Sequence, residues 1–170
     1  MGKILSILFL SAVTLLAPTL QSCDTSGCTE LRSATPRADF YSSATGEAIM
    51  LDSVSVVGVG VRGDSAIVSS GTRVSQTYLP MPPKADTVSW HFGYHWAALA
   101  DYGITDTVTI EYTRQPWFAG QECGAMYRYL IKRISYTENL IDSVIVADSL
   151  VTNIDRATLN IYFHVNVADS

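Results

Sequence analysis

Alternation of apolar and polar residues with period two dominates this chain, and such alternation is typical of half-buried β-strands. It is clearest near the C-terminal end, where every second residue from Leu159 to Val167 is apolar. The runs from Val88 to Tyr94 and from Val108 to Tyr112 alternate in the same way. We therefore expect strands near residues 53–59, 65–69, 73–79, 86–94, 106–113, 126–137, 143–147 and 158–167.

An Asp followed by Ser or Thr recurs at five of the expected strand starts, namely Asp52, Asp64, Asp86, Asp106 and Asp142. An Asp side chain accepts hydrogen bonds from backbone N–H groups two residues on, so we expect each to close a local turn. The irregular spacing excludes a solenoid repeat. Short strands separated by turns predict an all-β fold, an antiparallel β-sandwich (immunoglobulin-like) of seven to nine strands.

Two segments fit a helix as well as a strand. Residues 95–101 are rich in Ala and could form one helical turn, whereas 126–134 has a mixed pattern. Three tyrosines, Tyr127, Tyr129 and Tyr136, favour a strand for the second segment.

The N-terminus has the pattern of a lipoprotein signal peptide. Lys3 precedes an apolar run over 4–17, which is shorter than the roughly 20 residues of a membrane-spanning helix and stops at Pro18. The motif Leu20-Gln21-Ser22-Cys23 resembles a lipobox, after which the sulfur of Cys23 is diacylated and the chain is cut before it. We expect a lipid bilayer partner through acylated Cys23; an ordinary secretory peptide beside a chance cysteine is the alternative.

This pattern divides the chain into three parts. Residues 1–22 are the expected signal peptide, and 23–37, rich in Ser, Thr, Gly, Asp and Pro, form a flexible tether. Residues 38–170 form the β-sandwich domain. With 170 residues, of which 48% are hydrophobic, one domain is expected.

The expected mature chain is acidic. The whole sequence has a formal net charge of −5, and removing residues 1–22 deletes only Lys3, which leaves 10 cations, 16 carboxylates and a charge of −6. Lys and Arg do not gather into a cluster, so we expect no nucleic-acid partner.

If the lipid takes Cys23, the chain retains two cysteines, Cys28 and Cys123. In an exported domain two such cysteines are most simply a disulfide, which would link the N-terminal segment to the middle of the fold. The alternative is a pair of free thiols.

Two motifs resemble ligand-binding sites, but a structural role explains each of them better. Gly58, Gly60 and Gly63 have the spacing of a dinucleotide-binding loop, but a strand start follows instead of a helix, so we expect a hairpin turn and no cofactor. His91 and His95 would lie on one strand face about 13 Å apart, too far for one metal ion. We expect them to face solvent, with no metal site.

The aromatic run 90–96 and the pair Trp117 and Phe118 are candidates for a sugar-binding platform. Alternation predicts that most of these rings pack in the core. Trp96, Trp117 and Phe118 lie nearest to expected loops and form the candidate ligand platform.

Catalytic motifs such as G-x-S-x-G, H-E-x-x-H and C-x-x-C are absent from the sequence, so we assign no catalytic residue and expect no enzyme. A hydrolase whose catalytic carboxylates come together from distant strands is the alternative.

Several short motifs accompany the lipobox: Cys28, Leu51-Asp52-Ser53-Val54, Val57-Gly58-Val59-Gly60, Glu122-Cys123-Gly124, Asn139-Leu140-Ile141-Asp142-Ser143-Val144 and Thr152-Asn153-Ile154-Asp155. With these the chain resembles an uncharacterised lipoprotein family of Bacteroidetes that carries a domain of unknown function. The resemblance implies a β-rich envelope lipoprotein and transfers no catalytic residue. In such bacteria surface export requires acidic residues just after the lipidated cysteine, and only Asp24 is present there.

We therefore expect a lipid-anchored protein on the periplasmic face of the outer membrane. Its expected role is that of a non-catalytic binding or assembly module, with an envelope protein or a glycan as partner. The alternative is a glycan-binding lipoprotein that uses the loop aromatics.

Overall fold

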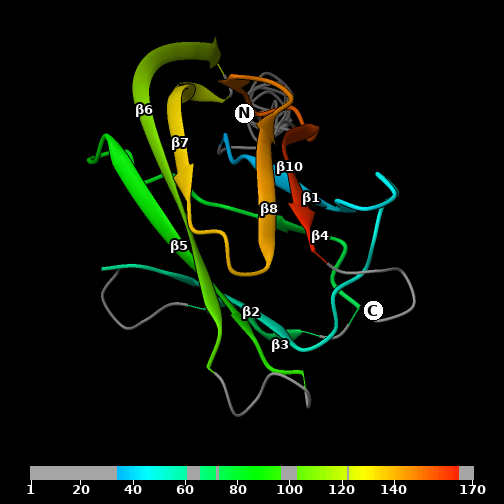
Figure 1. Cartoon of the computed structure of the whole chain (residues 1–170). Coiled ribbons are helices and arrows are strands. Elements are labelled where there is room, and N and C mark those ends of the chain that lie inside the picture. Colours follow the sequence, from blue (N-terminus) through cyan, green and yellow to red (C-terminus); the bar gives the residue numbers. More distant parts are fainter. Residues whose placement is uncertain (1–33, 61–65, 72, 97–102, 122, 165–170) are drawn as a thin grey trace, which may run out of the picture.

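The computed structural model describes residues 34–60, 66–71, 73–96, 103–121 and 123–164 (Figure 1). This part of the chain is all-β, as the alternation predicts, and none of it forms a helix long and apolar enough to cross a membrane. Its strands are β1 (Arg37–Ser42), β2 (Val54–Gly58), β3 (Ala66–Gly71), β4 (Gln76–Tyr78), β5 (Thr87–Tyr94), β6 (Thr105–Gly120), β7 (Gly124–Tyr136), β8 (Ile141–Val146), β9 (Leu150–Val151) and β10 (Ala157–Phe163).

The strands form two sheets that pack together, which confirms the predicted sandwich. One sheet has four strands in the order β4-β1-β10-β8, and the other has six in the order β3-β2-β5-β6-β7-β9. Neighbouring strands are antiparallel except β1 and β10, which run parallel. Each of the eight expected segments contains a strand, and the described residues add β1 and β9, which we did not expect.

The first strand corrects the expected boundary of the tether. β1 begins at Arg37, and Ala34 is already buried, at 6% exposed. Ala38 and Phe40 alternate inward along β1 and are fully buried. The short length of this strand and the turn-like composition before it hid it from the sequence pattern.

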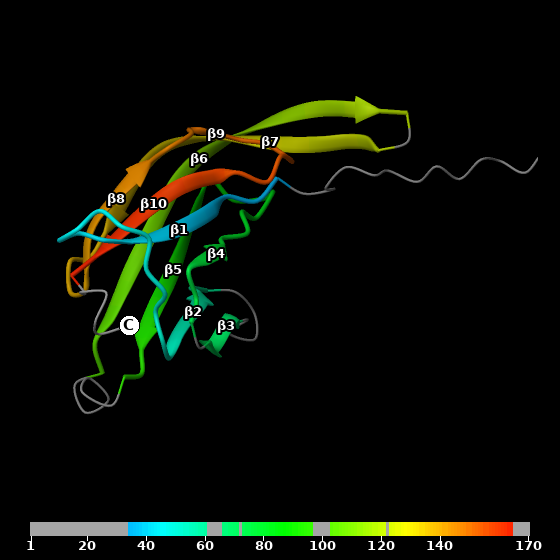
Figure 2. The same ribbon diagram turned by 90° about the vertical axis from the view of Figure 1, so that its right-hand side faces the viewer.

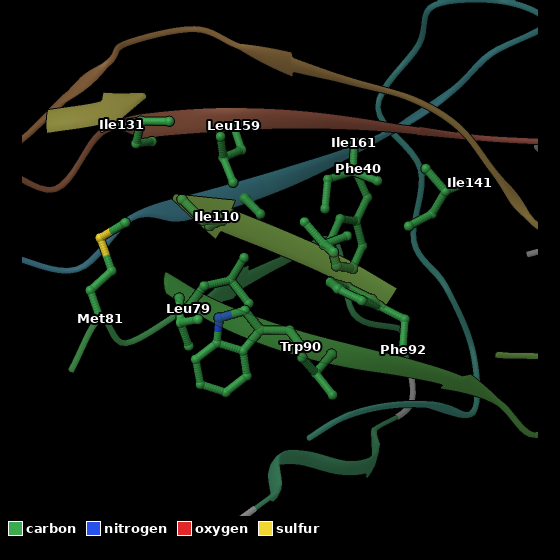
Figure 3. Close-up of a cluster of buried hydrophobic side chains, with 14 of the residues drawn as sticks. Phe40, Leu79, Met81, Trp90, Phe92, Ile110, Ile131, Ile141, Leu159 and Ile161 are labelled. Carbon is green, nitrogen blue, oxygen red and sulfur yellow. The ribbon is translucent and has the colours of Figure 1, made fainter. Parts of the chain in front are cut away.

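Aromatic rings from both sheets meet in the core. Phe40 of β1 packs edge-on against Phe163 of β10, with ring centroids 5.3 Å apart, and against Phe92 of β5 at 6.3 Å. Such edge-to-face pairs add about 0.5–1.5 kcal/mol each beyond burial of area. Figure 3 shows Phe40 and Phe92 among the aliphatic side chains that fill the space between the sheets. The alternation in β5 faces the core as predicted, because Val88, Trp90, Phe92 and Tyr94 are all buried.

The hairpin of β6 and β7 is much longer than expected. β5 pairs with β6 only as far as Glu111, and β9 pairs with β7 only at Tyr129 and Leu130. Beyond these points the two strands pair with each other up to Gly120 and Gly124. Figure 2 shows this end of β6 and β7 reaching past the other strands. We call residues 115–120 and 124–128 the arm; at ~3.3 Å per residue it is about 20 Å long. Residues 126–134, which fit a helix as well as a strand by sequence, therefore form part of the strand β7.

Two of the aspartates at strand starts, Asp52 and Asp106, do not act as expected. The carboxylate of Asp52 accepts the backbone N–H of Arg73 at 2.7 Å, and that of Asp106 accepts the N–H of Ile141 at 3.0 Å. Both bonds cross the fold instead of closing a local turn. Asp64 lies outside the described residues.

Candidate functional site

Large apolar side chains lie exposed on one face of the arm. Because side chains alternate along a strand, Pro116 and Phe118 point to the same side as the core residue Tyr112. On β7 the paired residues Tyr127 and Ala125 lie on this side too. In the body of the sandwich this side is buried, but on the arm Phe118 is 64% and Tyr127 46% exposed. An uncovered extension of a core face is a candidate contact surface.

The opposite face of the arm carries a stacked cation. The guanidinium carbon of Arg128 lies 3.6 Å from the centroid of the Trp117 ring, a cation–π contact. Trp117 pairs across the hairpin with Met126, which is only 7% exposed. Arg128 therefore covers one face of the Trp117 ring and removes that face from sugar stacking.

The base of the arm is held by a proline-rich segment. Tyr112 donates its hydroxyl to the carbonyl of Pro82 at 2.7 Å, and the Arg114 guanidinium donates to the carbonyl of Pro83. Arg114 also pairs with Asp86 at 3.4 Å. Burial raises the pKa of Tyr112 to about 12. These bonds fix the direction in which the hairpin leaves the sheet.

A pocket of about 390 Å³ lies beneath the arm, between β7, the start of the described chain and the prolines. Its lining consists of Ala34, Thr35, Pro80, Met81, Pro83, Ala125, Met126, Tyr127 and Tyr129. A second pocket, of about 330 Å³, lies against Pro80–Pro83, next to Trp90 and Ile67. The chain therefore enters the fold directly beside the arm.

The β6 edge of the arm is poorly suited to adding a further strand. The N–H of Tyr112 points toward β5, where it donates to the carbonyl of Asp86 at 2.9 Å. Arg114 and Pro116 follow Tyr112 by two and four residues, so their backbone groups lie on the same edge of β6. Pro116 has no N–H to donate there. A proline at this position is a common protection of an exposed edge. Contacts along the β6 edge therefore depend on side chains.

The three predicted platform residues do not come together. Gly93 pairs with Thr105, so Trp96 lies near the start of β6, whereas Phe118 lies 13 residues further along that strand, about 40 Å away at ~3.3 Å per residue. Trp96 is half-buried, its ring lies tilted against that of Tyr94 with centroids 5.9 Å apart, and its indole N–H donates to the carbonyl of Asp52. Trp117 and Phe118 do share the arm, but as neighbours on a strand they face opposite sides.

Cys123 lies in the turn at the tip of the arm and is disulfide-bonded. Cys23 and Cys28 lie outside the described residues, so the lipidation of Cys23 and the pairing of Cys28 with Cys123 stay predictions.

The two histidines face solvent, as the alternation predicts. His95 Nε2 lies 2.9 Å from Ser55 Oγ, and His91 Nδ1 lies 2.8 Å from Thr107 Oγ1, around a groove of about 670 Å³ over Gly93. Across the described ranges no carboxylate is bonded to His95, so the Ser–His contact has no third member among these residues. The same ranges hold no group of three or more His, Cys, Asp or Glu side chains placed to bind a metal ion.

The glycine motif belongs to a hairpin connection. β2 and β3 pair antiparallel, with Val57 opposite Ala66, and Gly60 has a φ of 73°, which suits a turn. Gly63 lies outside the described residues. A strand follows the motif, so the arrangement is that of the expected hairpin.

Of the arm residues, the sequence pattern identified Trp117 and Phe118 and missed Tyr127 and Pro116. The signal was present, because the apolar alternation that starts at Val108 resumes at Pro116 after the interruption by Arg114. Arg114 obscures this continuation, because a charged residue breaks the alternation where the predicted strand 106–113 ends.

A family model described as a family of unknown function (DUF6452) matches residues 53–163. The match extends from the start of β2 to the end of β10 and includes the whole arm. No curated protein and no solved structure matches the chain.

Proposed function

We propose that this chain, which belongs to the family of unknown function DUF6452, is a lipid-anchored envelope protein that binds its partner without catalysis through the arm. The observation that carries the proposal is the exposure of Phe118 and Tyr127 on a face that is core elsewhere in the sandwich. Leaving such rings in water forgoes the free energy of burying them, about 25 cal/mol per Å² of apolar surface. A contact that covers them recovers this free energy.

The lipid anchor in this proposal rests on the sequence before the domain. Lys3, the apolar run over 4–17 and the lipobox that ends at Cys23 have the order and spacing of a lipoprotein signal. Two or three acyl chains would hold the protein on a bilayer, since each buried CH₂ contributes roughly 0.8 kcal/mol. The periplasmic face of the outer membrane is the proposed location.

A glycan-binding lipoprotein is the second candidate, supported by the open ring of Phe118. The polar residues Gln115 and Arg128 lie on the face of the arm opposite Phe118, so they are not placed beside a sugar that stacks on that ring. The guanidinium of Arg128 also covers one face of Trp117, and this weakens the candidate because Phe118 is left as the exposed ring of the candidate platform.

The contact surface is tested in intact cells with a photo-crosslinking residue at position 118 and, as the control, at position 50. Met50 is 42% exposed and lies before β2, near the end of that sheet opposite the arm. We expect a defined adduct, protein, glycan or lipid, from position 118 and none from position 50. Equal labelling at both positions, or none at position 118, would contradict the proposal.

The anchor is tested separately by metabolic labelling with a palmitate analogue. We expect the label on the native chain and its loss in Cys23→Ala. A native chain without label would remove the lipid from the proposal while leaving the arm to be tested by crosslinking.

A further inference from the structure

The place where the chain enters the fold limits how far the arm can lie from the proposed anchor. Ala34 and Thr35 line the same pocket as Tyr127. Cys23 precedes Ala34 by eleven residues, and eleven residues span at most about 40 Å at ~3.6 Å each. The predicted disulfide would shorten this limit, because Cys28 lies five residues after Cys23 and five residues span at most about 18 Å.

Charge is distributed unevenly between the hairpin and the rest of the mature chain. Residues 105–136, the hairpin of β6 and β7, carry four cations and three carboxylates, a net charge of +1, whereas the rest of the mature chain carries six cations and thirteen carboxylates, a net charge of −7. Two of the four cations are paired, Arg114 with Asp86 and Arg133 with Glu111. Within the described part of the chain no carboxylate pairs with Arg128 or Lys132. Near an anionic surface each such cation is attracted, while the acidic body is repelled.

The aromatic residues of the arm are those that favour a membrane–water interface. Trp and Tyr concentrate at that depth because their rings are apolar and their N–H or O–H groups stay hydrated. Trp117 lies on one face of the arm, and Phe118 and Tyr127 lie on the other. The unpaired backbone edges of a two-stranded ribbon could not enter the hydrocarbon layer without losing hydrogen bonds to water. The chemistry therefore fits the headgroup region.

We infer that the arm docks on the phospholipid surface of the membrane that carries the chain's own anchor, with Phe118 and Tyr127 at headgroup depth and Arg128 among lipid phosphates. This inference rests on the proposed function and specifies its partner. A protein partner fits less well, because a stable protein interface buries roughly 800 Å² on each side. Two exposed rings on a narrow arm do not provide that area, and Pro116 interrupts the row of donors along the β6 edge.

The test uses the full lipidated chain in vesicles of phosphatidylethanolamine, with or without phosphatidylglycerol, whose lipids carry bromine near the headgroup. Bromine quenches nearby tryptophan. Trp90 in the core and Trp96 near the start of β6 serve as references. We expect Trp117→Phe to remove most of the quenching, and phosphatidylglycerol to increase quenching of the native chain.

A second pair of variants tests whether the loss of quenching in Trp117→Phe comes only from a change in the structure of the arm. In the Trp117→Phe background, Phe118→Trp should restore the quenching and Met50→Trp should not. Quenching that persists in Trp117→Phe, or that is equal for the two added tryptophans, would overturn the inference. If position 118 crosslinks to a protein while bromine quenches neither variant, the arm is a contact surface but its partner is not the membrane. If position 118 neither crosslinks nor is quenched, the proposed function fails as well.

Discussion

The hydroxyl of Tyr94 donates a hydrogen bond of 2.9 Å to the carboxylate of Asp106, and both side chains are buried. Asp106 belongs to β6 of the six-stranded sheet, yet it also binds the segment that leads into β8 of the other sheet. The further donors to its two oxygens are the Thr137 hydroxyl and the backbone N–H groups of Asn139, Leu140 and Ile141. This one carboxylate therefore ties the two sheets together.

Replacing this carboxylate by an amide should destabilise the fold strongly. In Asp106→Asn one acceptor oxygen becomes an NH₂ group that faces donors, and bonds to a charged group are each worth about 1.5–3 kcal/mol. We expect the free energy of unfolding, measured by urea denaturation, to fall by roughly 3 kcal/mol or more. Asp86→Asn is the control, because that side chain is 74% exposed, and it should change stability by less than about 0.5 kcal/mol. Equal effects of the two variants would refute a special role for Asp106.

Stability should decline in alkaline solution. Burial holds the pKa of Tyr112 at about 12, whereas a tyrosine in the unfolded chain ionises near pH 10. Between about pH 10 and 12 the unfolded chain therefore loses a proton that the folded chain keeps. The contribution is fully present below pH 10, and the free energy of unfolding then falls by up to ~1.4 kcal/mol per pH unit for this group.

Urea denaturation across this pH range measures the alkaline loss, and Tyr112→Phe should show a shallower decline than the native chain. Tyr94→Phe should act in the same direction, because burial and the Asp106 carboxylate raise the pKa of Tyr94. An unchanged slope in both variants would show that these hydroxyls do not couple to unfolding.

A side chain at position 93 should destabilise the fold because it would collide with Ser55. A Cβ at position 93 would lie 2.6 Å from Ser55 Oγ and 3.4 Å from His95 Nε2. Gly93→Ala therefore has to displace the Ser55 hydroxyl from its contact with His95, and we expect a loss of about 1 kcal/mol in thermal or urea unfolding. In a Ser55→Ala background the same substitution should cost less, and a double-mutant cycle without coupling would count against this explanation.

The predicted disulfide gives a further test. Cys123 is disulfide-bonded, and mass spectrometry of a non-reduced digest should identify Cys28 as its partner. Cys28→Ser should lower the free energy of unfolding by about 4–5 kcal/mol in the chain-entropy model. A reductant should bring the native chain to the same stability. Recovery of Cys23 in the bridge would instead refute both the pairing and the lipid anchor.

Substitutions of the exposed arm residues should weaken binding of the partner without destabilising the fold. Phe118 and Tyr127 are largely exposed, so Phe118→Ser and Tyr127→Ser should each change the free energy of unfolding by no more than about 0.5 kcal/mol. Both should reduce association of the arm with its partner. A large loss of stability in either variant would mean that these rings belong to the core.

Much of the β-structure could be predicted because period-two alternation is a local property of the chain. The inward side of β5, the solvent-facing His91 and His95, and strand structure in β7 all followed from residues within a few positions of one another. The choice of Trp117 and Phe118 as candidate contact residues came from their place near an expected loop. A layered all-β fold could therefore be inferred without knowing which strands pair.

Pairing between distant strands could not be predicted in the same way. β1 exists because Arg37–Ser42 hydrogen-bonds in parallel with β10, about 120 residues later, and no local pattern records that neighbour. β6 continues past Glu111 because β7 supplies its partners, and Phe118 is exposed because β5 and β9 end earlier. The length of β6 also explains why Trp96 and Phe118 lie far apart.

The sequence alone thus determined which residues alternate between the two faces of each strand, since that depends on the backbone of a few neighbouring residues. Only the tertiary structure decided which faces are covered, because burial depends on strands that are remote in the chain. The donors that meet Asp106 and the arm that extends uncovered beyond the sandwich both follow from that long-range assembly.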